Sequence, residues 1–202
     1  MPETTRPVDV YDLTAFVRDV EAILARSPSM PVKVKEVGAL TTRLVQDGSW
    51  LADRYRIGRE DCYARHLLHR DRQNRFVVLS LVWLPGQATP IHDHACWGTM
   101  GIVEGQIEEV NYDRLDDGAR RDYAELAEVG GKVVGPGSTS YLLPPYREIH
   151  RIGNPGPGTS VSVHVYGRDI DEVNVFDLVT RKVSTMRIKY YNPDTGGCEF
   201  AI

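Results

Sequence analysis

Two histidines separated by one residue, His92 and His94, carry the clearest chemical signal in this sequence. They follow an apolar run over residues 76–84 and come after Gly86, which has five residues between it and His92. In an extended strand, residues two apart point the same way, so both imidazoles would project from one face. Because imidazole binds divalent transition metals, the pair makes half of a metal site. Asp93 would point to the opposite face, so we expect it to support a metal ligand or to be structural rather than to bind the metal itself.

A third histidine, His150, lies far downstream and can complete that site. A lone His-x-His pair proves little, because ordinary surface and core histidines also fall at this spacing. Here the strand-like run, the glycines Gly86 and Gly105 and the distal histidine occur together. The sequence therefore predicts that one metal ion is held by His92, His94 and His150. The ligand set alone would accept Fe, Zn, Ni, Mn or Cu.

The spacing of these glycines and histidines, continued by Pro145, His150 and Asn154, resembles the two motifs of the cupin superfamily. Most metal-binding cupins add a glutamate ligand shortly after the second histidine, but Gly98 and Thr99 stand near that place here. Three neutral imidazoles leave a dipositive ion uncompensated by the protein. Such a site favours an anionic ligand, and a thiolate is a suitable soft one.

Several motifs between residues 63 and 166, about half of the chain, resemble the thiol dioxygenases typified by cysteine dioxygenase. The motifs are Thr89-Pro-Ile-His-Asp-His94, His150 with Asn154, Ser162-Val-His-Val-Tyr166 and Tyr63-Ala-Arg65. The resemblance implies a cupin-type β-barrel with ferrous iron, Fe(2+), at the three histidines. It also implies a reaction in which both atoms of O2 are added to the sulfur of a small thiol.

Two of these motifs resemble the family's relay and its substrate clamp. Ser162, His164 and Tyr166 alternate along a strand, so they share a face and can form a hydrogen-bonded chain with the phenol nearest the metal. On their own they would equally fit a sheet face with one satisfied histidine. Arg65, beside Tyr63, offers a planar, permanently charged fork that matches a carboxylate. Without the motif it would be an ordinary surface arginine.

Departures from the family pattern bear on crosslinking and substrate. Mammalian members carry a cysteine, near the position of Gly98 and Thr99, that crosslinks to the relay tyrosine. Cys96 is close in sequence but out of register, so we expect no thioether between Cys96 and Tyr166. With Gly98 near the place of that cysteine, the sequence is similar to a bacterial subgroup that acts on 3-mercaptopropionate. That subgroup, however, tends to have Gln in place of Arg65. Cysteine is therefore the first expected substrate, and 3-mercaptopropionate or another small mercapto acid is the alternative.

Composition bounds the class of protein. The 202 residues include 24 basic and 28 acidic side chains, a net charge of −4, which argues against nucleic acid or an anionic membrane as partner. One domain over residues 1–202 is the simplest prediction. Cys62, Cys96 and Cys198 fall at unrelated spacings that do not indicate a disulfide framework. Without a long apolar segment, a cytoplasmic location is expected. We expect a monomer, with oligomers still open.

The chain divides into a helical start, residues 1–60, and a β-rich remainder, residues 61–202. Apolar spacing predicts a first helix capped by Asp12 or Thr14 and broken across residues 28–31. Further helices are expected over 34–46 and 49–55. Strands are expected over 76–84, 98–103, 106–112, 139–143, 160–166 and 173–178, with an edge strand at 184–191 and a surface excursion at 115–130. The pattern predicts a mainly β fold, a small cupin-type barrel or jelly roll behind an N-terminal helical segment.

These features together predict an iron(II)-dependent thiol dioxygenase that oxidises cysteine with O2 to cysteine sulfinate. The rival class is a sugar-phosphate isomerase or a non-catalytic binding module on the same fold. An isomerase would need the metal-bound carboxylate that Gly98 replaces, and a binding module would not need the Ser162, His164 and Tyr166 relay. Metal analysis with oxygen uptake on a panel of thiols discriminates between these classes.

Overall fold

Two helices open the computed structural model, which describes residues 11–192 and 194–200. The first, α1 (Leu13–Ala25), is capped by Asp12, whose carboxylate accepts a hydrogen bond of 2.8 Å from the N–H of Ala15. The second, α2 (Met30–Leu44), begins earlier than predicted. Pro31 is tolerated there because the first helical turn has N–H groups without helical partners in any case.

Two short 3-10 helices, η1 (Gly48–Trp50) and η2 (Asp53–Arg56), replace the single helix predicted over residues 49–55. The Asp47 carboxylate accepts from the N–H of Ser49 and starts the first of them. They connect the helical segment to the first strand.

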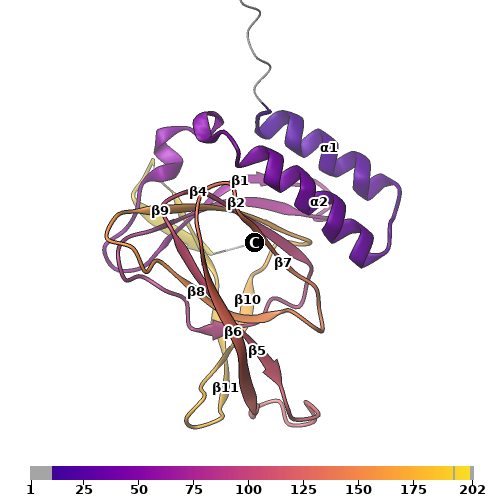
Figure 1. Cartoon of the computed structure of the whole chain (residues 1–202), viewed down its shortest axis with the longest axis vertical. Coiled ribbons are helices and arrows are strands. Elements are labelled where there is room, and N and C mark those ends of the chain that lie inside the picture. Colours follow the sequence, from indigo (N-terminus) through magenta and orange to yellow (C-terminus); the bar gives the residue numbers. More distant parts are fainter. Residues whose placement is uncertain (1–10, 193, 201–202) are drawn as a thin grey trace, which may run out of the picture.

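Two antiparallel sheets and a separate hairpin form the rest of the fold (Figure 1). The five-stranded sheet has the order β1-β2-β9-β4-β7, the six-stranded sheet has the order β11-β10-β3-β8-β5-β6, and β12 pairs with β13. The strands are β1 (Ala64–Arg70), β2 (Val77–Trp83), β3 (Ile91–His92), β4 (Gly98–Glu104), β5 (Ile107–Arg114), β6 (Leu126–Val134), β7 (Thr139–Leu142), β8 (Ile149–Gly153), β9 (Ser160–Tyr166), β10 (Glu172–Phe176), β11 (Val183–Arg187), β12 (Lys189–Asn192) and β13 (Gly197–Phe200).

Strands β2 and β9 are buried along their whole length because both of their faces are covered. Val78 and Val165 belong to a cluster with Phe16 of α1, so the helices cover the outer face of this sheet, as Figure 1 shows. Leu79 and Leu81 belong to the cluster that fills the barrel interior. Side chains therefore alternate along each strand between the face that packs against the helices and the face that points into the barrel. The polar side chains of the site lie on the inward face.

Three predictions for the β-rich part were wrong in detail. Strand β3 covers only Ile91–His92; irregular backbone follows, and the chain bends at Ala95, which takes a positive φ of 49°. Strand β6 begins at Leu126, so part of the expected surface excursion is paired with β5. The single edge strand expected at 184–191 is divided: β11 pairs with β10 at the sheet edge, and β12 turns into the hairpin with β13.

The predicted fold class is confirmed: the chain is mainly β, with antiparallel sheets that form a small barrel behind an N-terminal helical segment. The grouping of residues 1–202 into one domain stays a prediction. Among the described residues, no helix has the length and apolar character that would be needed to cross a membrane.

Candidate metal centre

Three histidines from different parts of the chain meet inside the barrel. His92 of β3 pairs directly with His150 of β8, and His94 follows β3 by two residues. Ring centroids are 4.6 Å apart for His92 and His94, 5.0 Å for His92 and His150, and 4.9 Å for His94 and His150. All three are buried, and one nitrogen from each lies within 4.8 Å of the others. The structure therefore brings together the three residues that the sequence singled out.

In all three imidazoles the hydrogen bond is made by Nδ1, which leaves Nε2 for a metal. Nδ1 of His92 lies 3.0 Å from the Pro90 carbonyl, and Nδ1 of His94 lies 3.3 Å from the Glu148 carbonyl. Nε2 of His150 is buried and has no hydrogen-bond partner among the described residues. An acceptor at Nδ1 fixes the proton there and leaves Nε2 as the donor atom for a metal. The cluster thus fits a divalent transition metal.

Burial keeps His92 and His94 neutral, as metal ligation requires. Burial is the largest cause that lowers the pKa of His92 to about 3, and repulsion from the neighbouring His150 adds to it. Burial also takes the pKa of His94 well below its usual value, with contributions from His92 and His150. Protonating such a cluster is unfavourable, because several like charges would share a space away from water.

A buried glutamate that the sequence analysis missed stands behind His150. Oε1 of Glu109 lies 3.4 Å from Nδ1 of His150, and Ser140 Oγ lies 2.9 Å and 2.6 Å from the two carboxylate oxygens. Nζ of Lys132 is 3.4 Å from Oε2. Burial alone would raise the pKa of Glu109, but the hydrogen bond and the electrostatic effect of His150, followed by the hydrogen bond from Ser140 and the charge of Lys132, lower it to about 2. The one available signal was an acidic residue at an inward position of β5.

The predicted relay residues form a continuous hydrogen-bonded chain on the inner face of β9. Ser162 Oγ lies 2.9 Å from Nε2 of His164, and Nδ1 of His164 lies 3.0 Å from the hydroxyl of Tyr166. Trp83, which the sequence analysis did not single out, donates from Nε1 to Ser162 Oγ at 3.0 Å. Ser162 can then donate to Nε2, which places the His164 proton on Nδ1, where it donates to the phenol oxygen.

Tyr166 ends this chain beside the histidine cluster. Its ring stacks on the ring of His94, with centroids 5.2 Å apart and planes 24° apart. Burial raises the pKa of the Tyr166 phenol, and the charge of Arg65 opposes that effect without cancelling it. The phenol therefore stays protonated, and its hydrogen is left for a group outside the relay.

Arg65 projects from β1 as a buried cation without a hydrogen-bond partner at two of its nitrogens. The residue is 9% exposed, and Nε and Nη2 are both unpartnered among the described residues. The guanidinium carbon lies 5.6 Å from the centre of the Tyr190 ring. Its neighbour in the predicted clamp, Tyr63, stacks on Trp83 with centroids 4.4 Å apart. A buried guanidinium in this state is set to receive an anion.

Tyr190, which supports Arg65, was also missed, because it lies in the C-terminal hairpin. Its hydroxyl donates to the buried carboxylate of Asp169, and Arg70 Nη2 forms an ion pair of 2.7 Å with the same carboxylate. Asp169 thereby fixes the ring over which Arg65 lies.

Two other residues singled out by the sequence have structural hydrogen bonds. Both carboxylate oxygens of Asp93 bond to Asn174, at 3.1 Å to its N–H and 2.8 Å to its amide. Asn154 donates to the Trp83 and Gly158 carbonyls at 3.0 Å and 2.7 Å. Neither residue belongs to the histidine cluster.

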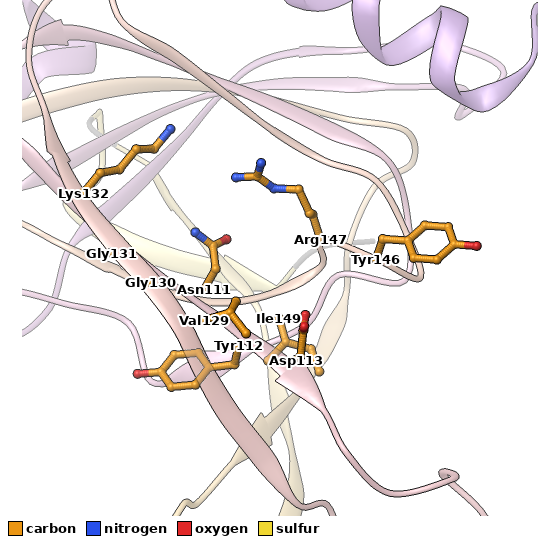
Figure 2. Close-up of a pocket in the computed structure, with 10 residues that line it drawn as sticks. All are labelled: Asn111, Tyr112, Asp113, Val129, Gly130, Gly131, Lys132, Tyr146, Arg147 and Ile149. Atoms are coloured by element: carbon orange, nitrogen blue, oxygen red, sulfur yellow. The ribbon is translucent and has the colours of Figure 1, made fainter.

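Two pockets reach this network from the surface. A pocket of about 280 Å³ is lined in part by Tyr63 and Arg65. A second pocket, of about 340 Å³, is lined in part by Asn111, Lys132 and Arg147. Figure 2 shows the polar ends of these three side chains pointing into the space between them. Solvent can thus approach both Arg65 and the lysine that pairs with Glu109.

Comparison with known proteins gives a family match and similarity to curated proteins. The family model described as cysteine dioxygenase type I matches residues 5–179. Cysteine dioxygenase type 1 of Danio rerio is 24% identical over 134 residues, which cover 64% of this chain and 63% of that protein. The match therefore spans less than two thirds of the relative's length.

Solved structures show a partial likeness. An uncharacterized conserved protein with a double-stranded β-helix domain, from Klebsiella pneumoniae, has a TM-score of 0.45 and 19% identity, covering 57% of this chain and 80% of that one. A Cupin 2 conserved barrel domain protein from Salinispora arenicola has a TM-score of 0.38 and 20% identity, covering 52% and 74%. Neither ligand nor activity follows from likeness at this level.

Proposed function

Because the chain belongs to the cysteine dioxygenase type I family, we propose that it is an iron(II)-dependent thiol dioxygenase that converts cysteine and O2 to cysteine sulfinate. His92, His94 and His150 hold the iron, Arg65 and Tyr63 bind the substrate, and Ser162, His164 and Tyr166 form the relay. The family supports the reaction class, and the choices of metal and substrate rest on the chemistry of the site.

One observation supports this function best: a metal-ligating nitrogen and a guanidinium, both buried and near one another, lack hydrogen-bond partners among the described residues. Nε2 of His150 needs a metal, and the guanidinium of Arg65 needs an anion. Arg65 is close enough to the cluster that its charge contributes to the lowered pKa of His94, after burial and the neighbouring histidines. A small molecule with a thiolate at one end and a carboxylate at the other would satisfy both groups.

The protein's own groups have distinct tasks in this proposal. Ferrous iron at the three imidazoles would supply the position that a thiolate binds and the electrons that activate O2. Arg65 grips the carboxylate through a charge-assisted pair and so fixes the direction of the substrate. Tyr166 offers its phenol hydrogen to the bound substrate, and the His164 proton at Nδ1 holds the phenol oxygen in place. The buried walls keep water away from the reacting sulfur.

Cysteine is the proposed substrate because Arg65 is present, and 3-mercaptopropionate is the alternative within the same class. The pocket of about 280 Å³ that Tyr63 and Arg65 line is the proposed path of entry. A non-catalytic metal-binding barrel is the distant alternative. It would leave the Ser162, His164 and Tyr166 chain without a purpose.

Metal analysis and thiol-dependent oxygen uptake test the proposal together. The wild-type protein should bind about one iron per chain and consume O2 when cysteine is added, whereas His150→Ala should lose most of both. His69→Ala is the control, because His69 packs against Phe76 with ring centroids 5.3 Å apart and is outside the cluster. Full iron content in His150→Ala, or no thiol-dependent uptake by the iron-loaded wild type, would refute the assignment.

A further inference from the structure

We propose that Glu109 is a positioning residue that supplies, through His150, negative charge to the metal centre. The inference rests on the metal site of the proposed function but concerns a residue outside the three ligands. The cupin-type glutamate ligand is missing after His94, where Gly98 and Thr99 stand. The carboxylate of Glu109 is nevertheless close to the metal position, because it contacts the Nδ1 side of the His150 ring, opposite the nitrogen left for the metal.

The three histidines differ in what accepts their Nδ1 hydrogen. His92 and His94 meet backbone carbonyls of Pro90 and Glu148, which are neutral acceptors. His150 alone meets a carboxylate, at 3.4 Å. A hydrogen bond to an ionised acceptor is stronger than one to a carbonyl, and it makes the opposite nitrogen of the ring a better donor to a metal. His150 is therefore the one ligand of the three whose Nδ1 faces a full negative charge.

The surroundings of Glu109 keep it charged and in place. Its side chain is 1% exposed, and Ser140 donates to it at 2.6 Å. Lys132, at 3.4 Å from Oε2, pairs with the carboxylate from the side away from His150 Nδ1. A carboxylate surrounded by donors acts as an acceptor only, which is its ionised state.

Lys132 sets how much of that charge reaches His150. Its side chain is 42% exposed, and it lines the pocket in Figure 2 with Asn111 and Arg147. Neutralising Lys132 should let Glu109 act more strongly on His150, and neutralising Glu109 should remove the effect. Opposite charges near a metal shift its reduction potential in opposite directions, because negative charge stabilises the more positive oxidation state.

The test measures iron affinity and the Fe(III)/Fe(II) midpoint potential of the full-length protein. Glu109→Gln keeps the shape of the side chain, and it should weaken Fe(II) binding by about 10- to 100-fold and move the potential to more positive values. Lys132→Met should move the potential to more negative values. Glu108→Gln is the matched control, since Glu108 pairs with Arg151 at the surface and should change neither quantity.

Each outcome decides the inference. An unchanged affinity and potential in Glu109→Gln overturns it, as does a shift of the same sign in Glu109→Gln and Lys132→Met. If Glu109→Gln does not fold, the Lys132→Met potential decides alone, and an unchanged or positive shift overturns it. A wild type that binds iron with these responses but oxidises no thiol would sink the proposed function and leave this inference standing. A protein that binds no iron would overturn both.

Discussion

Gly98 and Tyr166 are directly paired across strands β4 and β9. A Cβ built on Gly98 would lie 3.0 Å from Cδ1 of Tyr166 and 3.1 Å from Leu142. The space beside Gly98 is therefore already occupied by the Tyr166 ring and the Leu142 side chain. Cys96 is buried in the same hydrophobic cluster as Tyr166, but it lies at a bend before β4 and is not the residue that pairs with Tyr166.

This pairing predicts that Cys96 and Tyr166 are not covalently linked. A tryptic digest of the iron-loaded protein, taken after turnover, should contain both residues on separate, unmodified peptides. Mass spectrometry that found a thioether-linked pair would show that the loop around Cys96 adopts another register during catalysis.

Replacing Tyr166 by Phe should keep iron and lower turnover. The change removes only the hydroxyl group that ends the relay, and the ring that stacks on His94 remains. We expect kcat to fall by about 10-fold or more, with unchanged metal content. Ser162→Ala should have a smaller effect in the same direction, because it acts on the phenol through His164. A Tyr166→Phe variant with wild-type kcat would show that this strand face is only structural.

Replacing Arg65 by Ala should raise KM for every carboxylated thiol. The expected loss in kcat/KM is about 2–4 kcal/mol, the range for a charge-assisted pair left unpaired. Arg59→Ala is the control, because Arg59 lines the same pocket but forms an ion pair with Asp61.

Cysteamine completes this experiment, because it lacks the carboxylate. It should be a poor substrate for the wild type and should change little in Arg65→Ala. A wild type that used cysteamine as well as cysteine would remove Arg65 from the binding site. Much faster turnover of 3-mercaptopropionate than of cysteine would instead shift the assignment to the alternative substrate.

The metal-free protein should lose stability in mild acid. Burial is the largest cause that lowers the pKa of His92 from 6.5 to about 3, and burial also takes the pKa values of His94 and His164 well below 6.5. Between the folded and the unfolded pKa of such a histidine, the unfolded chain binds more protons than the folded one. The free energy of unfolding therefore falls as pH falls from 6.5 toward 3. Each buried histidine contributes up to about 1.4 kcal/mol per pH unit in that window.

Urea unfolding of the metal-free protein checks this pH dependence. Midpoints should be lower at about pH 5.5 than at about pH 7.5, and His164→Asn should reduce the slope with pH because one titrating ring is gone. A free energy of unfolding that is constant across this range would mean that the histidines titrate in the folded protein as they do in the unfolded chain, so that burial does not lower their pKa values.

The sequence was sufficient for those parts of the site that depend on local spacing. Alternation along one strand placed Ser162, His164 and Tyr166 on a common face, and the structure has them there. The His92 and His94 pair was found for the same reason, although β3 ends at His92 and His94 follows in irregular backbone. Local patterns are enough where one element carries the whole motif.

Residues that act across elements could not be found in this way. Glu109 reaches His150 only because β5 and β8 are neighbours in the sheet, and that pairing is a tertiary property. Tyr190 meets Arg65 because the C-terminal hairpin folds back beside β1, which no spacing in the sequence indicates. The first part of β6, residues 126–130, falls in the predicted surface excursion, because a polar stretch does not reveal its pairing with β5.

Oxygen-isotope labelling of the product tests the central claim most directly. The iron-loaded protein should be given cysteine and labelled O2 in unlabelled water, and the product analysed by mass spectrometry. Our account predicts cysteine sulfinate in which both sulfinyl oxygens carry the label, and no such product from His150→Ala. A product with one or no labelled oxygen, or cystine as the sole product, would contradict the assignment of this chain as a thiol dioxygenase.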